Sequence, residues 1–428
     1  MMRVFLLAWS ALWTVGLPLI WVYLRRRGRK DPMYTAHLAE RLGRYGTTLP
    51  GAVWVHAVSL GEVRSAVPLI QALLAQGDRV VITLFTPAGR REAERVFAAP
   101  IAAGQLAAVW VPLETTWAYA GFFRAFQPRY GLVMEIEIWP RMVFAAKAQA
   151  VPLFMCNAQY PARSIARDGR GLRLRQQVMR GFAGAFVKSQ LQADRFAAIG
   201  VRNIAVTGEL RFDQPIPPAL IAAGQDMRAA LGLTPRRVIA LASTVEGEDD
   251  IYIKAIAAIL ATENPPFIVY IPRRSERFAE VEQRLQAAGF SVVRRSALPA
   301  RTLPLAGPLP DILLGDSMGE MYFYLTMADA VVVGGGFTPM GAHNIIEPLA
   351  LRKPVITGPE IGTIEYPFIE AEAAGVAARV PDAAALAAAL SSDQAPDPAR
   401  IDAFFVAHSG GVARFLAALP QVLAQARG

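Results

Sequence analysis

Short apolar runs alternate with longer segments of helical spacing along this chain, and the alternation occurs twice. In the first half, the runs AVWVHAV (52–58), RVVITLF (79–85) and AAVWVP (107–112) are each followed by a helical stretch. Strands that alternate with helices of ten or more residues indicate βαβ units and a parallel sheet. The pattern restarts beyond residue 213 with RRVIALAS (236–243), so we expect two Rossmann-like, doubly wound α/β halves.

The predicted domain boundaries follow the composition. A Pro-rich segment, QPIPPAL (214–220), is typical of an interdomain linker and separates the two halves. Two Rossmann-like halves joined in this way are expected to face a central cleft at the carboxyl ends of their strands. We therefore predict four parts: an N-terminal membrane anchor with a basic flank (1–30), two Rossmann-like domains (31–213 and 214–400), and a closing helix (401–428) that packs back on the first domain.

The N-terminus carries an uncharged apolar stretch of 21 residues, Val4 to Leu24. At a rise of 1.5 Å per residue, this stretch can cross a hydrocarbon core about 30 Å thick. The sequence RRRGRK (25–30) follows it at once, whereas a signal peptide carries its charges before the apolar run. Under the positive-inside rule, this order favours a cytoplasmic body held at a membrane. A helix that lies in the membrane interface and is kinked at Pro18 is the alternative.

Composition excludes several classes of protein. The formal net charge is +9, but six basic residues lie within residues 1–30, which leaves +3 for the remainder. A body so close to neutral has no strong field for tracking phosphates, so nucleic acid is not expected as a partner. The single Cys156 excludes an internal disulfide and a thiolate-rich zinc site, and the four scattered histidines argue against a His-rich metal site.

A candidate general base lies in HAVSLGE (56–62), where a predicted strand runs into a helix. Ser59 and Glu62 have the S-x-x-E spacing of a capping box, so one interpretation is simply the start of a helix. The other interpretation is a carboxylate at the end of a strand that removes a proton from a substrate. Gly61 would then let the substrate approach the backbone closely.

Two further acids and a cation are candidates for the same edge of the sheet. In EIEIWP (135–140), period-two geometry would place Glu135 and Glu137 on one face of a strand. Acids at the end of a buried strand are costly unless they are paired or functional, so ion pairing with an arginine and a catalytic role are both open. Arg211 in GELRFD (208–213) could complement these acids or a developing negative charge.

Nucleotide-binding features gather in the second half. VVVGGGF (331–337) is a strand that runs into a glycine loop, although it lacks the spaced fingerprint of a dinucleotide site. In the helix expected after it, Asn344 and Glu347 lie on one face. The N-terminus of a helix suits a phosphate group, and an acidic side chain one turn later suits the hydroxyl groups of a ribose. Three arginines that follow a strand could form a phosphate clamp: Arg273, Arg274 and Arg277.

The ordered set of motifs resembles the 3-deoxy-D-manno-octulosonic acid (Kdo) transferases of lipopolysaccharide assembly. The resemblance covers nearly the whole chain and rests on ERLGRYG, HAVSLGE, EIEIWP, NAQYPARS, GELRFD, ASTVEGE, PRRSERF, DSMGE and GGGF followed by GAHNIIEP. It implies a GT-B glycosyltransferase fold, CMP-Kdo as the donor, and the lipid A precursor (lipid IVA) as the acceptor, with no cofactor and no metal. It also implies a cytoplasmic body attached to the bacterial inner membrane.

Carried over position by position, the resemblance makes Glu62 the general base of an inverting transfer to the acceptor hydroxyl. Glu135 and Arg211 correspond to residues that support the transition state. The second domain would hold the CMP of the donor through Pro272, Arg273, Met318, Gly319, Glu320, Asn344, Ile345, Ile346 and Glu347. The chemistry is consistent with these roles, because CMP is a good leaving group and the reaction needs a base, charge stabilisation and positioning.

Several positions depart from the usual motifs of the family. Glu209 and Arg211 replace the Asn and Lys of GNLKFD, and NAQYPARS replaces NARLSERS. Val245 stands in place of the His of STHEGE, and Arg274 in place of the His of PRHPERF. These changes bear on the sugar and the acceptor, so a GT-B lipid glycosyltransferase with another donor, such as a UDP-sugar, and a catalytically silent paralogue are alternatives. An NAD oxidoreductase is disfavoured by the missing glycine fingerprint.

Overall fold

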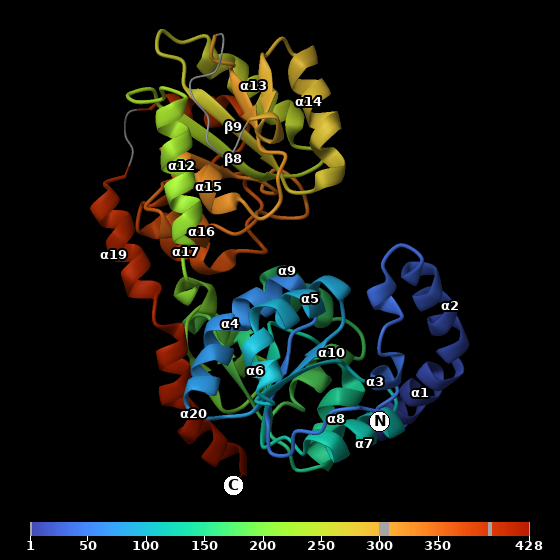
Figure 1. Ribbon diagram of the computed structural model, residues 1–428. Coiled ribbons are helices and arrows are strands. Elements are labelled where there is room, and N and C mark those ends of the chain that lie inside the picture. Colours follow the sequence, from blue (N-terminus) through green and yellow to red (C-terminus); the bar gives the residue numbers. More distant parts are fainter. Residues whose placement is uncertain (1, 299–307, 393–395, 428) are drawn as a thin grey trace. The chain divides into compact units, whose positions relative to one another are not determined.

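The computed structural model describes residues 2–298, 308–392 and 396–427. Its contacts divide the chain into two units (Figure 1), of which the first comprises Met1–Gln214 with Ser409–Gly428 and the second comprises Pro215–His408. The chain passes from the first unit to the second at the start of QPIPPAL and returns to the first unit near its end. This return lies between His408 and Ser409, whereas the sequence analysis placed it at residue 401.

A parallel sheet of seven strands forms the centre of the first unit in the described residues. The strands are β1 (Val53–His56), β2 (Val80–Leu84), β3 (Leu106–Trp110), β4 (Tyr130–Met134), β5 (Leu153–Ala158), β6 (Gly184–Val187) and β7 (Ile204–Val206). Their spatial order is β3-β2-β1-β4-β5-β6-β7, so the direction of the winding reverses between β1 and β4. The carboxyl ends of parallel strands share one edge, and doubly wound sheets bind ligands at that edge beside such a reversal.

Helices cover both faces of this sheet. They are η1 (Pro32–Tyr34), α3 (Leu38–Arg41), α4 (Leu60–Ala75), α5 (Pro87–Val96), α6 (Ala98–Ala102), α7 (Thr116–Phe126), α8 (Pro140–Ala148), α9 (Ala162–Asp168), α10 (Leu174–Met179), α11 (Gln190–Ala198), η2 (Leu210–Asp213) and α20 (Gly411–Arg427). Val53 and Val55 of β1 share a core with α4 and α20, whereas Trp54 between them stacks against Phe122 of α7. The period-two alternation of the strand therefore assigns one set of helices to each face.

The second unit contains a second seven-stranded parallel sheet among its described residues, in the order β10-β11-β9-β8-β12-β13-β14. Its strands are β8 (Val238–Thr244), β9 (Phe267–Pro272), β10 (Val292–Arg294), β11 (Ile312–Leu314), β12 (Ala330–Val333), β13 (Val355–Thr357) and β14 (Ala377–Arg379). Its helices are α12 (Pro218–Ala230), α13 (Asp249–Leu260), η3 (Ser275–Arg277), α14 (Phe278–Ala287), η4 (Arg295–Ala297), α15 (Met321–Met327), α16 (Ile346–Ala350), α17 (Glu365–Ala373), α18 (Ala383–Ser391) and α19 (Pro398–His408). The prediction of two α/β halves with parallel sheets is confirmed.

The last helix, α20, completes the core of the first unit. The ring of Phe415 lies 4.4 Å from the ring of Phe186 in β6, measured between centroids. At the start of this helix, the carboxylate of Asp213 accepts hydrogen bonds from the backbone N–H groups of Gly410 at 2.6 Å and Val412 at 2.7 Å. These contacts satisfy donors that a helix leaves unpaired at its first turn. The closing segment thus contributes α19 to the second unit and α20 to the first.

The N-terminal apolar stretch forms two helices, α1 (Met2–Val15) and α2 (Leu17–Gly28), which meet at an angle of 52°. The kink lies at Gly16, two residues before the predicted position, because Pro18 fits the first turn of α2, where its missing N–H costs no hydrogen bond. By length and composition the pair could cross a membrane, and residues 398–427 pass the same test although they contribute to the cores of both units. Length and composition alone therefore do not assign a membrane span.

Two glycines hold the ERLGRYG segment against α7. A Cβ atom at Gly121 would lie 2.0 Å from the carbonyl oxygen of Gly43, and one at Gly43 would lie 2.3 Å from the carbonyl oxygen of Ala118. Real side chains never approach backbone atoms so closely. The contact between the segment and the helix therefore requires glycine at both positions.

We expect Gly121→Ala to lower the free energy of unfolding by about 1–3 kcal/mol, because the added Cβ must push the segment away from α7. Gly46→Ala is the matched control in the same segment, since nothing lies within 4 Å of the Cβ that it would add. Thermal unfolding of both variants measures the difference. Equal melting temperatures would contradict the packing argument.

Candidate active site

The residues predicted to carry the chemistry of the first unit follow the carboxyl ends of its central strands. Glu62 follows β1, and Glu135 follows β4, the neighbour of β1 in the sheet. Arg211 follows β7 at the end of the row, and Lys188, which was not predicted, follows β6. The structure brings Glu135 and Arg211 into one polar cluster and places Glu62 at the same edge.

Glu62 lies in the first turn of α4 within a capping arrangement. Its Oε2 accepts a hydrogen bond from the backbone N–H of Val58 at 2.8 Å, and its Oε1 accepts one from the hydroxyl of Ser59 at 3.0 Å. The Ser59 oxygen accepts from the Glu62 N–H at 3.4 Å, which starts the helix. The S-x-x-E spacing therefore caps the helix, and the same hydrogen bonds fix the orientation of the carboxylate.

The environment of Glu62 makes its carboxylate a stronger base than that of an exposed glutamate. Burial raises the pKa of Glu62 to about 8, against the hydrogen bonds from Val58 and Ser59 and with a further contribution from the charges of Glu137 and Glu135. A general base works best when its pKa lies near the working pH. The capping role and the role of a base are therefore compatible in one residue.

A buried ammonium group connects the acids at this edge. The Nζ of Lys188 lies 2.9 Å from Glu135 Oε2 and 2.8 Å from Glu209 Oε2, and the lysine side chain is only 5% exposed. Asn157 Nδ2 donates to the Oε1 of each acid, at 3.0 Å to Glu135 and 2.7 Å to Glu209. The cation between the two carboxylates is thus a lysine, and among the described residues no three His, Cys, Asp or Glu side chains form a metal-binding group.

Arg211 forms the more exposed part of this cluster. Its Nη2 lies 3.7 Å from Glu135 Oε1, and its Nε donates to Ser65 Oγ at 3.1 Å. Burial would raise the pKa of Glu209, but the charges of Lys188 and Arg211 outweigh it and lower the pKa to about 2. Glu209 is therefore ionised in the folded protein.

The EIEIWP segment does not continue β4 as a strand. The strand ends at Met134, and Glu135 has a left-handed backbone with φ of 56°, so the prediction that Glu135 and Glu137 share one strand face is wrong. Glu137 accepts a hydrogen bond from the indole N–H of Trp139 at 2.9 Å. Burial raises the pKa of Glu137, against that hydrogen bond and the charge of Arg175. The two acids thus have different partners, and the ion pair of Glu135 is chiefly with a lysine.

A buried carboxylate fills the glycine loop of the second unit. Both oxygens of Glu248 lie 2.8 Å from the backbone nitrogen of Gly335, and Oε1 also accepts from the N–H of Phe337 at 3.0 Å. Glu248 belongs to ASTVEGE (242–248) and is fully buried. These N–H groups of the loop are therefore bound by the protein itself, and we do not assign the donor phosphate to them.

The HNIIEP segment also differs from its prediction. Helix α16 is five residues long and begins at Ile346, so Asn344 precedes it and does not share a helical face with Glu347. Asn344 Oδ1 accepts from the N–H of Ile346 at 3.0 Å and closes a turn. A helix of barely more than one turn has too small a dipole to attract a phosphate by itself.

The fold brings the PRRSERF and HNIIEP motifs together. Arg273, directly after Pro272 at the end of β9, is hydrogen-bonded through its guanidinium to His343 Nδ1. Burial and the charge of Arg273 lower the pKa of His343 to about 4, so the imidazole is neutral at pH 7 and accepts the hydrogen bond. Arg273 nevertheless remains an exposed residue.

The DSMGE segment forms an exposed turn after β11. Gly319 has φ of 84° with open space at its Cβ position, and Met318 is 67% exposed. The Glu320 carboxylate accepts from the hydroxyl of Ser317 and lies 3.5 Å from the guanidinium of Arg295. The predicted nucleotide residues therefore follow β9, β11 and β12, whose carboxyl ends share one edge of the second sheet.

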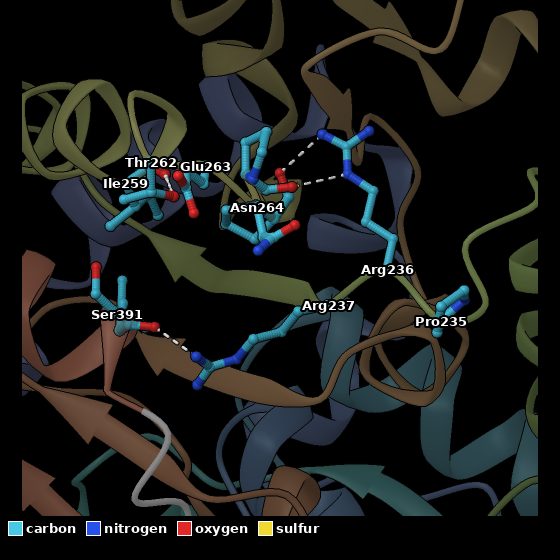
Figure 2. A pocket seen from close by; sticks show the side chains of 11 residues that line it. Pro235, Arg236, Arg237, Ile259, Thr262, Glu263, Asn264 and Ser391 are labelled. Carbon is cyan, nitrogen blue, oxygen red and sulfur yellow. Dashed lines mark hydrogen bonds between the residues drawn. The ribbon is translucent and has the colours of Figure 1, made fainter.

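A cavity of about 820 Å³ lies at the opposite, amino-terminal edge of the second sheet (Figure 2). Arg236, just before β8, donates to the carbonyl oxygens of Pro265 and Pro266 at 2.9 and 3.1 Å. Arg237 donates to the carbonyl oxygen of Leu390 at 2.7 Å. Both guanidinium groups thus bind backbone, and the described lining contains none of the predicted site residues. We do not assign the reaction to this cavity.

Three residues of these edges were missed in the sequence analysis: Lys188, Asn157 and Glu248. The available signal for the first two was a polar residue at the carboxyl end of an apolar run, in GAFVKS and VPLFMCNA. Such a residue falls at the ligand-binding edge of a parallel sheet. For Glu248 the only signal was a single acid in a glycine-containing turn, which is unspecific.

Two parallel-sheet α/β units of this kind match the fold of GT-B glycosyltransferases. A glycosyltransferase structure from Rickettsia africae matches with a TM-score of 0.57 over 89% of this chain and 99% of that chain, at 12% identity, which supports the fold alone. Residues 36–214 match the family model described as 3-deoxy-D-manno-octulosonic-acid transferase (kdotransferase).

Two relatives extend the match beyond the first unit. The chain is 41% identical to the 3-deoxy-D-manno-octulosonic acid transferase of Bordetella pertussis, over 94% of this chain and 96% of that protein. It is 30% identical to the protein of the same name from Haemophilus influenzae, over 84% of this chain and 83% of that protein. The chain belongs to the 3-deoxy-D-manno-octulosonic acid (Kdo) transferase family and is a glycosyltransferase, which confirms the resemblance seen in the motifs.

We expect Lys188→Met to destabilise the first unit by about 3–5 kcal/mol, because it leaves buried Glu209 and half-buried Glu135 without their shared cation. Lys147→Met removes a lysine from the exposed side of α8 and serves as the control. Melting temperatures at pH 7 measure both effects. If Lys188→Met has the same melting temperature as the wild type, the ion pairs of Lys188 do not stabilise this edge.

Proposed function

We propose that this enzyme transfers Kdo from CMP-Kdo to the lipid A precursor with inversion at the anomeric carbon. The observation that carries the proposal is Glu62, a half-buried carboxylate of raised pKa that is fixed at the carboxyl end of β1 beside a charged cluster. The similarity to the Kdo transferases of Bordetella pertussis and Haemophilus influenzae supports the choice of sugar.

Glu62 acts as the general base. Its ionised carboxylate takes the proton of an acceptor hydroxyl while the hydroxyl oxygen forms a bond to the anomeric carbon of the donor. The bond from that carbon to the phosphate oxygen breaks, and CMP leaves with the electron pair from the face opposite the attack. The hydrogen bonds from Val58 and Ser59 occupy one lone pair on each carboxylate oxygen and leave another for the proton.

The charged cluster supplies the cation for the sugar. Kdo is a 2-keto sugar acid, so the donor carries a carboxylate beside the reacting carbon. Lys188 is buried between Glu135 and Glu209, whereas the Arg211 side chain is 29% exposed. Arg211 therefore binds the sugar carboxylate, and Glu135 orients the guanidinium. Arginine suits this role because its planar fork matches a carboxylate.

The second unit holds the nucleotide. Arg273 binds the phosphate of CMP with its guanidinium, and the turn from Met318 to Glu320 and the segment from Asn344 to Glu347 bind the nucleoside. Support comes from the shared edge of the sheet and from the Arg273–His343 hydrogen bond, which links two of the three segments. Each unit thus supplies one part of the reaction, and no cofactor is needed.

The enzyme works at the cytoplasmic face of the bacterial inner membrane, where its lipid acceptor lies. Helices α1 and α2 attach it there. Support comes from their exposed apolar side chains and from the five basic residues that follow Leu24 within residues 25–30. Such a cluster also binds anionic head groups.

We expect Glu62→Gln to reduce transfer by about 10²–10⁴-fold, because the amide cannot take the proton. In the wild type, kcat/KM rises about tenfold per pH unit below pH 8 and levels off above it, since only the ionised carboxylate of a group with pKa about 8 is active. Mass spectrometry of the product formed from CMP-Kdo and tetra-acylated lipid A precursor measures both. Asp226→Asn, on the exposed side of α12, is the control, and a wild-type rate in Glu62→Gln would rule out this base.

We expect CMP at about 100 times its Kd to stabilise the protein by about 2.7 kcal/mol, because it binds only the folded state. Arg273→Met should lose most of this stabilisation, whereas Lys254→Met, exposed on α13, should retain it. Differential scanning calorimetry with CMP and with UDP provides the measurement. A rise in melting temperature with UDP and none with CMP would favour the alternative of a UDP-sugar donor.

A further inference from the structure

Polar contacts bind the first N-terminal helix to the body of the first unit. The indole N–H of Trp9 donates to the Oε2 of buried Glu114 at 2.9 Å. Arg141 at the start of α8 donates to Ser10 Oγ at 2.9 Å and to the carbonyl oxygen of Leu6 at 2.6 Å. Helix α1 accordingly lies beside α8 (Figure 1). Attachment to lipid alone would not require such contacts with the catalytic unit.

A pocket of about 330 Å³ lies where α1 meets the EIEIWP segment. Three indole rings line it, those of Trp9 and Trp13 from α1 and that of Trp139 from EIEIWP. Glu137 and Arg175 add a carboxylate and a guanidinium to the lining. The pocket therefore offers aromatic faces together with both signs of charge.

This pocket lies next to the proposed general base. Glu137, which lines it, is close enough to Glu62 for its charge to contribute to the raised pKa of Glu62. The ring of Trp139 lies 5.8 Å from the ring of His56, the residue that ends β1, measured between centroids. The pocket therefore lies at the edge of the sheet that carries Glu62.

The other side of α1 is apolar and exposed. Val4, Leu7 and Leu12 have exposed fractions of 70%, 69% and 64%. Helix α1 therefore has one side suited to lipid and another that lines an aromatic, charged pocket. A molecule whose acyl chains remain in the lipid while its sugar reaches the pocket would match both sides of the helix.

We propose that this pocket binds the sugar-phosphate head of the lipid acceptor and that Trp9 and Trp13 form one of its walls, which makes α1 part of the acceptor site. The proposal deepens the proposed function and rests on it. Indole rings pack on the apolar faces of sugar rings, while Glu137 and Arg175 suit hydroxyl and phosphate groups. An acyl chain in the same place would cover both charged side chains with hydrocarbon, which costs free energy.

The test compares two tryptophans of the N-terminal helices. Trp13→Ala removes a wall of the pocket, and Trp21→Ala removes an exposed tryptophan of α2 that does not line it. We expect Trp13→Ala to raise the KM for the lipid acceptor about tenfold and to leave the KM for CMP-Kdo unchanged. Trp21→Ala removes a membrane-facing tryptophan without touching the pocket, so any change in acceptor KM that comes from weaker membrane attachment appears in both variants. Both should bind phosphatidylethanolamine–phosphatidylglycerol vesicles equally, and only Trp13→Ala should show the additional rise in acceptor KM. Equal acceptor KM values in the two variants would overturn the proposal.

A competitor separates the sugar head from the acyl chains. The deacylated head of the acceptor should inhibit the wild type and Trp21→Ala, and should inhibit Trp13→Ala about tenfold more weakly. Ile138→Trp, which fills the pocket from the opposite segment, should weaken inhibition in the same way. Inhibition only by a lipid without a sugar head would assign the pocket to an acyl chain and overturn the proposal.

Failure of the proposed function itself would look different. If the wild-type enzyme makes no Kdo-bearing product, the proposed reaction is contradicted. Binding in the pocket is then measured directly. Calorimetric titration with the deacylated head then decides the matter. Binding to the wild type and Trp21→Ala with loss in Trp13→Ala supports the pocket, and no binding to the wild type overturns it.

Discussion

The charge balance around Lys188 is the interaction on which the polar, carboxyl-terminal edge of the first sheet depends. Its ammonium group lies between Glu135 after β4 and Glu209 after β7, so one side chain connects loops from both sides of β5 and β6. Glu209 also accepts from the backbone N–H of Arg211 at 3.2 Å, which caps the turn that carries Arg211. The acid at position 209, where the family usually has Asn, is therefore compensated by the lysine and by Arg211. The same acidic surroundings contribute to the basicity of Glu62.

Local patterns predicted the strands, the start of α4 and the position of Glu62, because each depends on neighbours within a few residues. They failed at Glu135, where strand alternation was expected to continue. The left-handed backbone there is compatible with a hydrogen bond from Asn157 and an ion pair with Lys188, which are 22 and 53 positions away in the sequence. A period of two contains no information about partners so distant.

The glycine run of the second unit shows the same limit. Three consecutive glycines indicate that another group approaches the backbone, but they do not say which group. In the structure the groups that come close are Ser243, Gly341 and Thr357, whose oxygens lie 2.5, 2.3 and 2.4 Å from the Cβ positions of Gly334, Gly335 and Gly336. The carboxylate of Glu248, 87 positions before Gly335, instead accepts hydrogen bonds from the N–H groups of this loop. The topology brings the residues predicted to bind the donor to one edge of the sheet. The N–H groups of the glycine loop at that edge, however, are bound by Glu248 of the protein itself. Membership of the Kdo transferase family follows from the sequence, whereas the binding of the glycine loop by Glu248 is visible only in the structure.

The discontinuity of the first unit has a consequence for synthesis of the chain. Residues 215–408 emerge from the ribosome as a complete unit before residues 409–428, which the first unit needs for its core. Domains generally fold as units as they emerge, so here the unit encoded second completes its core first. Until α20 arrives, the apolar face around Phe186 is uncovered. A ribosome that stops before residue 409 would release an intact second unit attached to a first unit that cannot close its core.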